Sequence, residues 1–245
     1  MKSTVRVTLL ILGVLIADQA LKFYIKTNFE YNQQVPILGL SWANLHFVEN
    51  EGMAFGMTFN WEYGKLLLSI FRILMAGGLI WYLSQMIKMR MPMGLVYSIG
   101  LICAGAVGNI IDSAIYGLIF TESPYHGGIA RLVPFGQGYG TFLHGKVVDM
   151  FYFPLFTIPL PEWLGGGDFL FFSPIFNIAD AAITTGIFSI LLFQRSFFKN
   201  PEEAMEMAPS QEVVGDASPV SPSVQSELKD TASDRDAEIK RPSDS

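Results

Sequence analysis

The chain has 245 residues, of which 51% are hydrophobic and only 16% are charged, and its mean hydropathy is +0.37. A soluble domain of this size seldom combines these values, so the composition indicates a membrane protein. The formal net charge of −6 comes from residues 198–245, which hold eleven acidic and five basic residues, whereas residues 1–197 hold eleven of each. The charge therefore gives no reason to expect a nucleic-acid partner, and we expect none.

Four segments are apolar over the roughly 20 residues that a helix needs to cross a bilayer. They are residues 5–25, 66–87, 93–118 and 174–193. We therefore predict a membrane all-α fold in which residues 1–197 form a domain of four transmembrane helices. The first segment could also be a cleavable signal peptide, because two basic residues precede its apolar run. Against this, no A-x-A cleavage site follows, and the run continues through Asp18 and Lys22.

Lysine and arginine concentrate next to the apolar segments on one side, as they do in cytoplasmic loops. These residues are Lys2, Arg6, Lys88, Arg90, Arg195 and Lys199. The segment 27–64 contains neither residue type. We therefore expect both termini to be cytoplasmic and the two large loops, residues 27–65 and 119–173, to face outward.

Residues 198–245 are rich in serine, proline and acidic residues, with no aromatic residue after Phe198. Such a segment cannot bury enough apolar surface to fold alone. We predict that it is a disordered acidic cytoplasmic tail, and its composition favours a solvated extension over a binding motif.

Asp18 and Lys22 lie inside the first apolar segment. An ionisable side chain at the centre of a spanning helix costs roughly 2.5 to 3.5 kcal/mol on insertion scales, so it usually has a partner or a function. The two residues are four apart and share a helix face, where they can pair. We interpret them as a structural ion pair near the outer end of the helix.

Two further pairs of polar residues recur at helical spacing. Asn109 lies three residues before Asp112, and Asn177 lies three residues before Asp180, so each pair shares one helix face. The small residues of AGAVGN, residues 104–109, favour close approach of another helix beside the first pair. This combination predicts a polar site lined by closely packed helices.

Asp149, in the sequence KVVDMF, and Asp180 both lie near the predicted outer ends of apolar segments. Two carboxyls that share a site can hold one proton near neutrality, because repulsion raises one pKa, and such a pair can activate water. The same residues also suit a proton or cation relay. With asparagine carbonyls they would also suit a divalent cation. Their spacing alone does not choose among these mechanisms.

Five short motifs occur along residues 1–197. They are ADQALK (17–22), VENEGMAFG (48–56), AGAVGNIID (104–112), KVVDMF (146–151) and FNIADAAI (176–183). Their order and their places relative to the apolar segments resemble those of the lipoprotein signal peptidases, also called signal peptidase II. Each string is weakly specific alone, but five in register make accidental agreement improbable.

The resemblance implies a multi-pass aspartyl endopeptidase of the bacterial inner membrane with its active site at the extracytoplasmic face. Such an enzyme cuts the signal peptide from prolipoproteins just before the cysteine that carries a diacylglyceryl group. The resemblance implies no metal and no organic cofactor. As partners we expect the diacylglyceryl-modified prolipoprotein substrate and membrane lipid, and we expect a monomer.

By the same resemblance, Asp149 and Asp180 are the catalytic pair. The residues that match family positions around the substrate are Asn50, Gly52, Asn109 and Asn177. The residues that match supporting positions are Asp18, Lys22 and Asp112. The family adds to its four helices a small extracytoplasmic β-cradle and a mobile periplasmic loop. Residues 31–59 would supply both, with residues 35–47 strand-like.

The chain departs from the family pattern in one charge. Ser113 stands where the family usually continues its GNxxD motif with arginine. Arg72, in the second apolar segment, is unusually deep for a cation. We predict that Arg72 supplies the missing positive charge from a neighbouring helix, with snorkelling to the outer surface as the alternative.

The chain also departs in length, because residues 119–145 and 154–172 are longer than the family norm. The glycines, prolines and aromatic residues of these segments suit ordered loops at the membrane surface. Shaping the substrate entrance and passive interfacial anchoring are both open for them.

Two other classes of protein remain as alternatives to a peptidase. A carboxylate-relay transporter usually has internal repeats and broken helices in matching positions, and the two halves of this chain show no such symmetry. A non-enzymatic scaffold would leave Asp149 and Asp180 without a purpose that offsets their cost. We therefore favour the peptidase, then the transporter, then the scaffold.

Overall fold

The structure, a computed structural model, describes residues 3–51 and 64–197. Residues 52–63, which include Gly52 and the end of the stretch 31–59 proposed to hold the mobile loop, and the predicted acidic tail 198–245 lie outside the described residues. The helices are α1 (Ser3–Asn28), α2 (Gly64–Lys88), α3 (Met93–Ile111), the short α4 (Gly117–Ile119) and α5 (Ile178–Phe197), with a π-helical turn, η3 (Asp112–Tyr116), between α3 and α4.

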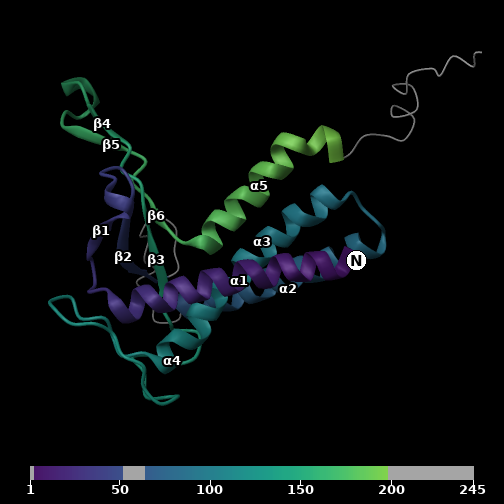
Figure 1. The fold of residues 1–245 in the computed structure, drawn as a ribbon, viewed down its shortest axis with the longest axis horizontal. Helices are drawn as coiled ribbons and strands as arrows, with labels where there is room; N and C mark the ends of the chain where they lie inside the picture. Colours follow the sequence, from purple (N-terminus) through teal and green to yellow (C-terminus); the bar gives the residue numbers. More distant parts are fainter. Residues whose placement is uncertain (1–2, 52–63, 198–245) are drawn as a thin grey trace, which may run out of the picture. The chain divides into compact units, whose positions relative to one another are not determined.

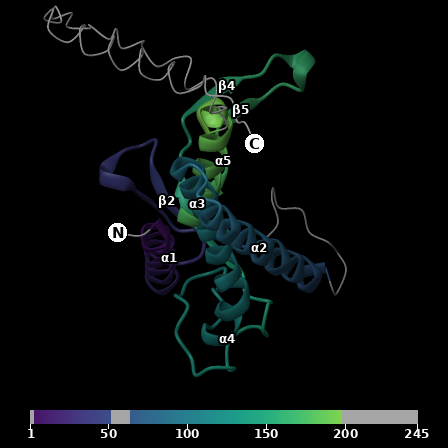
Figure 2. The same cartoon turned by 90° about the vertical axis from the view of Figure 1, so that its right-hand side faces the viewer.

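Helix α3 is the centre of the helical part. It packs against α1, α2 and α5, which surround it in Figure 2. Its glycines allow this approach: a Cβ on Gly108 would lie 2.9 Å from Asp18 Oδ2, and one on Gly105 would lie 2.6 Å from Ile183 Cγ1. The prediction that AGAVGN permits close helix packing is therefore confirmed.

Among the described residues, three helices are long and apolar enough to cross a membrane, namely Ser3–Asn28, Leu66–Lys88 and Met93–Ile119. They confirm the first three predicted segments to within a few residues. The apolar helix Ile178–Phe193 is shorter than the fourth predicted segment, residues 174–193. The predicted start at Pro174 was wrong, because Ile175 and Phe176 form a strand that pairs with another strand.

The strands form two antiparallel sheets. The larger sheet has the order β1-β2-β3-β6, and the smaller pairs β4 with β5. Their bounds are β1 (Gln34–Pro36), β2 (Asn44–Asn50), β3 (Val147–Tyr152), β4 (Phe156–Pro159), β5 (Asp168–Phe171) and β6 (Ile175–Phe176). The larger sheet lies at the end of the helices away from the N-terminus, as Figure 1 shows.

The expected small β-structure is therefore present, but residues 35–47 are not one strand. A 3-10 turn, η1 (Ile37–Gly39), separates β1 from β2. Leu38 and Gly39 both have positive φ, 50° and 76°, which breaks an extended strand. The turn lets the chain reverse, so that β2 pairs with β1 on one side and with β3 on the other.

Two apolar clusters hold these parts together. One joins α1, α2 and α3 and contains Val7, Leu83, Met86, Leu95, Val96, Ile99 and Cys103. The other joins the end of α1 to the sheet and to η3 and contains Ile25, Phe29, Phe47, Tyr116, Phe120, Val148 and Met150. The second cluster includes both neighbours of Asp149 in β3, so the strand that carries this carboxylate is fixed by packing on each side of it.

Candidate active site

The structure brings Asp149 and Asp180 into one hydrogen-bonded chain through two asparagines. Asn177 Nδ2 donates to Asp149 Oδ1 at 2.7 Å, and Asn109 Nδ2 donates to Asp180 Oδ1 at 2.8 Å. The two amides are themselves joined, because Asn177 Nδ2 also lies 3.2 Å from Asn109 Oδ1. Asp149 is 4% exposed, whereas Asp180 is half-buried. The two carboxylates therefore face a common polar site.

Asp180 is positioned by the start of α5. The Asp180 N–H donates to Asn177 Oδ1 at 2.9 Å, and the Asn177 N–H donates to Asp180 Oδ2 at 3.3 Å. This reciprocal pair is a capping box, which satisfies backbone donors at a helix N-terminus. The three-residue spacing was read from the sequence as two residues within one helix, but Asn177 precedes the helix and caps it.

Lys22 determines how the Asn109 amide is oriented. Its ammonium lies 2.8 Å from Asn109 Oδ1 and donates to it. That oxygen also receives a bond from Asn177, so the Asn109 Nδ2 group is left to face Asp180. Lys22 is fully buried and makes two ion pairs, with Asp18 at 2.9 Å and Asp112 at 2.8 Å. The predicted pairing of Asp18 with Lys22 is confirmed.

Asp18 and Asp112 each hold the backbone next to a candidate catalytic residue. Asp18 Oδ1 accepts from the N–H of Ala179, which precedes Asp180, at 2.8 Å. Asp112 Oδ2 accepts from the N–H of Val148, which precedes Asp149, at 3.3 Å. The network around Lys22 thus reaches both carboxylates through the main chain.

Sequence reasoning missed Gln19 and Tyr116. Gln19 Nε2 donates to Asp112 Oδ1 at 2.8 Å and to the Gly108 carbonyl at 3.2 Å, and the Tyr116 hydroxyl donates to Gln19 Oε1 at 3.2 Å. An amide between Asp18 and Lys22 in an apolar segment was the available signal for Gln19. Tyr116 had no comparable signal, because no motif in the sequence marked the π-helical turn η3, at the end of which it lies.

The electrostatics of the site favour a shared proton. Burial, and next the nearby charge of Asp180, raise the pKa of the Asp149 carboxyl from 3.8 to about 7. Hydrogen bonds from Asn177 and Asn50 act in the opposite direction. A carboxyl pair of this kind can hold one proton near neutral pH and serve as acid and base together.

Three further residues that the sequence analysis named lie at different places relative to the two carboxylates. Asn50 Nδ2 lies 3.4 Å from Asp149 Oδ2, at the end of β2, so the structure brings it to the site. Arg72, on α2, is half-buried and lies within electrostatic range of Asp180 and Asp149. Ser113 is buried, and its hydroxyl donates to the Asn109 carbonyl at 3.2 Å, one helical turn earlier. Its side chain is therefore hydrogen-bonded to the helix backbone.

A second buried charge lies one turn beyond Lys22. Lys26 forms an ion pair with Glu49 of β2, and its ammonium is 3.1 Å from Ser123 Oγ. The same ammonium lies over the rings of Phe120 and Tyr139, at 5.3 and 5.2 Å from their centroids. This cluster, Lys26, Glu49, Ser123, Phe120 and Tyr139, was not predicted. It joins α1 to the sheet and to the loop that precedes β3.

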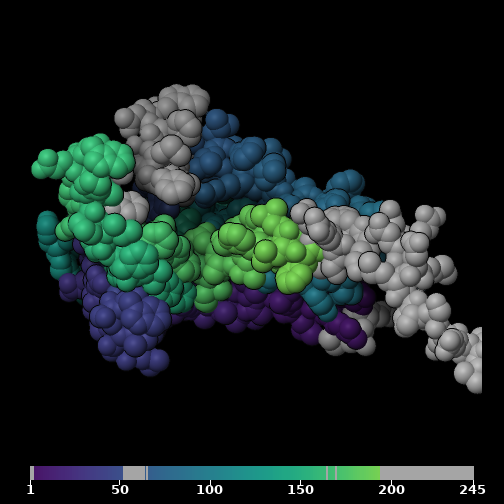
Figure 3. Space-filling view, turned by 90° about the horizontal axis from the view of Figure 1, so that it is seen from above, coloured from purple at the N-terminus to yellow at the C-terminus, as the bar shows by residue number. Residues whose placement is uncertain are grey.

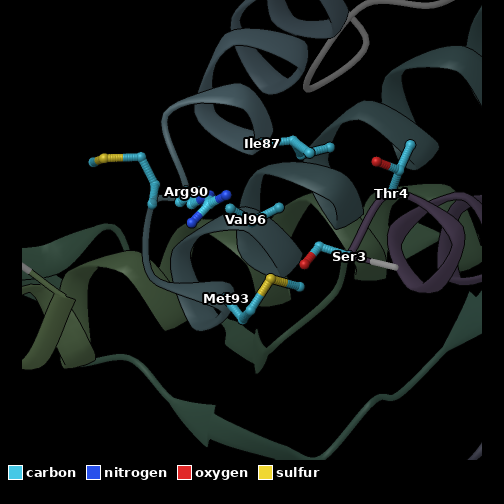
Figure 4. A pocket seen from close by; sticks show the side chains of 7 residues that line it. Ser3, Thr4, Ile87, Arg90, Met93 and Val96 are labelled. Atoms are coloured by element: carbon cyan, nitrogen blue, oxygen red, sulfur yellow. The ribbon is translucent and has the colours of Figure 1, made fainter. Parts of the chain in front are cut away.

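The part of the chain that the structure describes offers another concave site far from the aspartates. A pocket of about 520 Å³ lies between the start of α1 and the α2–α3 connection, as Figure 4 shows. Its lining residues are Ser3, Thr4, Ile87, Arg90, Met91, Met93 and Val96. This lining contains no carboxylate, histidine or cysteine, so it offers no acid/base pair. Over residues 3–51 and 64–197, no group of three or more such side chains is placed to hold a metal ion.

Comparison with known proteins points to one family. A family model described as Signal peptidase (SPase) II matches residues 10–197. The chain is 45% identical over 191 residues to a lipoprotein signal peptidase of Porphyromonas gingivalis (strain ATCC 33277). The alignment covers 76% of this chain and 81% of the relative. The chain is 34% identical over 196 residues to a lipoprotein signal peptidase of Amoebophilus asiaticus (strain 5a2), which covers 78% of each chain.

The fold is also similar to that of solved proteins. A bacterial membrane enzyme solved by the in meso method at 2.3 Å resolution aligns with a TM-score of 0.53 and 23% identity. The alignment covers 80% of this chain and 92% of that one. At this level of identity the likeness concerns the fold, and the chemistry of the site has to be argued from its residues.

Proposed function

Because the chain belongs to the signal peptidase II family, we propose that it is an aspartyl endopeptidase that removes the signal peptide from prolipoproteins, just before the diacylglyceryl-modified cysteine. Its family membership makes it a protease with several apolar helices that can span a membrane. The observation that carries the finer proposal is the chain of hydrogen bonds from Asp149 through Asn177 and Asn109 to Asp180.

In this mechanism the two carboxyls act on one water molecule. The ionised member removes a proton from the water, which attacks the carbonyl carbon of the scissile peptide bond, while the protonated member donates a hydrogen bond to the carbonyl oxygen. A proton then passes from the dyad to the departing amine as the carbon–nitrogen bond breaks. The dyad titrates as a unit, so the proton is assigned to the pair.

The asparagines hold this geometry. Asn109 and Asn177 each donate to one carboxylate, which fixes the rotamers of both acids before substrate arrives. Asn50 approaches Asp149 from β2, where it can meet the substrate backbone. Gly52 is proposed for the same role from the family pattern. The site is supported by the buried ion pairs of Lys22 with Asp18 and Asp112.

The proposed topology places this site at the outer face of the inner membrane. Helix α5 has 20 residues, which at 1.5 Å per residue gives about 30 Å, the thickness of a bilayer core. With α5 as a fourth crossing, the positions of the basic residues place both termini in the cytoplasm. The substrate is itself anchored in the membrane, so it reaches a monomeric enzyme by lateral diffusion. No metal or organic cofactor takes part in the proposed reaction.

A cleavage assay tests the proposal. Purified protein in detergent is incubated with a diacylglyceryl-modified prolipoprotein peptide, with and without chelator, and compared with Asp149→Asn and Asp180→Asn. We expect cleavage before the lipidated cysteine that survives chelator and falls about 10²- to 10⁴-fold in each variant. The matched control is Asp168→Asn, an exposed aspartate on β5, which should cleave like the parent. A folded parent that cleaves nothing, or cleavage abolished by chelator, would contradict the mechanism.

Arg72 is proposed to supply the positive charge that the family places after its GNxxD motif. Its electrostatic range to both Asp180 and Asp149 supports this role. We expect Arg72→Ala to lower kcat about tenfold or more and Arg72→Lys to retain most activity, because a lysine keeps the charge. Both variants are assayed on the same lipopeptide. Activity like that of the parent in both variants would favour an Arg72 that only reaches the outer surface.

A further inference from the structure

Residues 153–172, between the strand of Asp149 and the start of α5, form a separate two-stranded hairpin. Strand β4 pairs with β5, so that Phe156 lies opposite Phe171 and Pro159 opposite Asp168. The rings of Phe156 and Phe171 are stacked, with centroids 4.7 Å apart and planes 8° apart. A 3-10 turn, η4 (Glu162–Leu164), and three glycines with positive φ, residues 165–167, close the tip. Residues with a Cβ would be strained at these three positions.

The hairpin exposes several large apolar side chains. Its exposed large side chains are Leu155, Phe156, Ile158, Trp163, Phe171 and Phe172, and Trp163 at the tip is 82% exposed. A two-stranded sheet is marginally stable in water without a surface to pack on. Contiguous exposed aromatic residues of this kind mark a binding surface. Figure 1 shows the hairpin extending away from the larger sheet, and Figure 3 shows it at the sheet end of the molecule.

The base of the hairpin is joined to the catalytic strand by aromatic contacts. The rings of Phe153 and Phe172 both lie close to that of Phe176, with centroids at 5.7 and 6.3 Å. The ring of Phe151, on β3, stacks on that of Phe153 at 6.3 Å. The base of the hairpin therefore lies next to Phe176, two residues before α5 begins. A continuous series of rings connects the predicted boundary of the bilayer to the strand that carries Asp149.

The charge of the segment identifies what covers it. Residues 147–176 contain no lysine or arginine, and their acidic residues are Asp149, Glu162 and Asp168. A surface without cations is not held by anionic lipid headgroups or by an acidic protein. Tryptophan and other aromatic residues are enriched at the headgroup level of membranes, where the ring body is apolar and its edge is hydrated.

We propose that the hairpin, residues 153–172, lies in the headgroup and upper acyl region of the outer leaflet, and that its occupant is the lipid itself. Trp163 and the stacked pair Phe156–Phe171 are in contact with lipid in the absence of substrate. The aromatic base then fixes the depth of β3, and hence of Asp149, relative to the bilayer. This inference rests on the proposed membrane crossing of α5 and not on the peptidase activity.

Lipid quenching of a probe at the tip tests the inference. Full-length protein carrying Cys103→Ala and Trp163→Cys is labelled with a small fluorophore and placed in nanodiscs of phosphatidylcholine and phosphatidylethanolamine. Lipids with quenchers at the headgroup or along the acyl chain are added to the composition. We expect loss of most of the fluorescence with headgroup and upper acyl quenchers, and little loss with aqueous iodide. The loss should be unchanged by salt or by anionic lipid.

The control places the same probe at His126, which is exposed in the segment between α4 and β3. There we expect the opposite pattern, with quenching by iodide and little by lipid. Fluorescence at residue 163 that follows the pattern of residue 126 would overturn the proposal. Quenching by lipid that appears only after lipopeptide is added would also overturn it, in favour of a substrate-binding hairpin. Adding Asp149→Asn to the labelled protein should leave the quenching unchanged, so a failure of the proposed activity and a failure of this inference are distinguishable.

Discussion

Lys22 and Lys26 lie one turn apart on α1 and are both fully buried, yet they hold different parts of the molecule. Lys22 binds two carboxylates and one amide, and these groups lead to the backbone of Val148 and Ala179 beside the two candidate catalytic acids. Lys26 binds a single carboxylate, Glu49, together with one hydroxyl and two rings.

The difference shows that the role of a buried lysine depends on its neighbours. Around Lys22, two carboxylates share one ammonium. Each partner of Lys22, namely Asp18, Asp112 and Asn109, has a further hydrogen bond to a candidate catalytic residue or to the backbone beside one. Around Lys26, one carboxylate, that of Glu49, accepts from the ammonium, and the other contacts are to Ser123 and to aromatic faces. The first network orients the residues around the two candidate catalytic acids, whereas the second attaches β2 and the loop that precedes β3 to α1.

The largest effect is expected from Lys22→Met. The substitution leaves Asp18 and Asp112 buried without their ammonium, and we expect the free energy of unfolding to fall by about 5 kcal/mol, the upper end for breaking a buried pair. Cleavage should be lost even at temperatures where the variant is folded, because Asn109 loses the donor that orients its amide. Unfolding in detergent and cleavage of lipopeptide measure the two effects.

Lys88→Met, at the exposed last turn of α2, is the matched control and should behave like the parent. Adding Asp18→Asn to Lys22→Met should recover part of the stability, since it removes one uncompensated charge, without recovering activity. A double variant that regains cleavage would show that the network only stabilises the fold.

A smaller effect is expected from Lys26→Met. It leaves one carboxylate, Glu49, which keeps the hydrogen bond from Ser123, so we expect a loss of about 3 kcal/mol, the lower end for a buried pair. Substituting both members, as Lys26→Met with Glu49→Leu, should restore most of the stability. The value of kcat should be close to that of the parent and KM should rise, because β2 positions Asn50. A loss of kcat as large as that of Lys22→Met would remove the distinction between the two networks.

The pH profile gives the smallest effect and reports on the dyad alone. Because burial and the charge of Asp180 raise the pKa of Asp149 to about 7, the pair should lose its shared proton above that pH, and kcat/KM should then fall, approaching tenfold per pH unit. The same shift lowers the free energy of unfolding as pH rises from 3.8 to about 7, because the unfolded chain releases this proton first. Lys26→Met should leave the alkaline limb in place, and a profile without that limb would contradict the shared proton.

Sequence alone was enough for the features that depend on local spacing. Three apolar segments have the length and composition of membrane helices, and each was found within a few residues. The i, i+4 spacing of Asp18 and Lys22 required them to share a helix face, and they pair. The small residues of 104–109 were enough to predict close helix packing, because a glycine without a Cβ leaves room for the neighbouring helix.

Only the tertiary structure decided which residues meet across the chain. Glu49 reaches Lys26 because β2 pairs with β3 beside α1, and no periodicity encodes that contact. Asn177 caps α5 because Ile175 and Phe176 pair with β3 as strand β6. That strand ends at Phe176, so Asn177 is the residue between the strand and the helix. Residues 154–172 were interpreted as a surface loop, since a hairpin requires cross-strand hydrogen bonds that become apparent only when the two strands lie together. Local spacing determines which side chains share a face, but pairing between distant segments determines what that face meets.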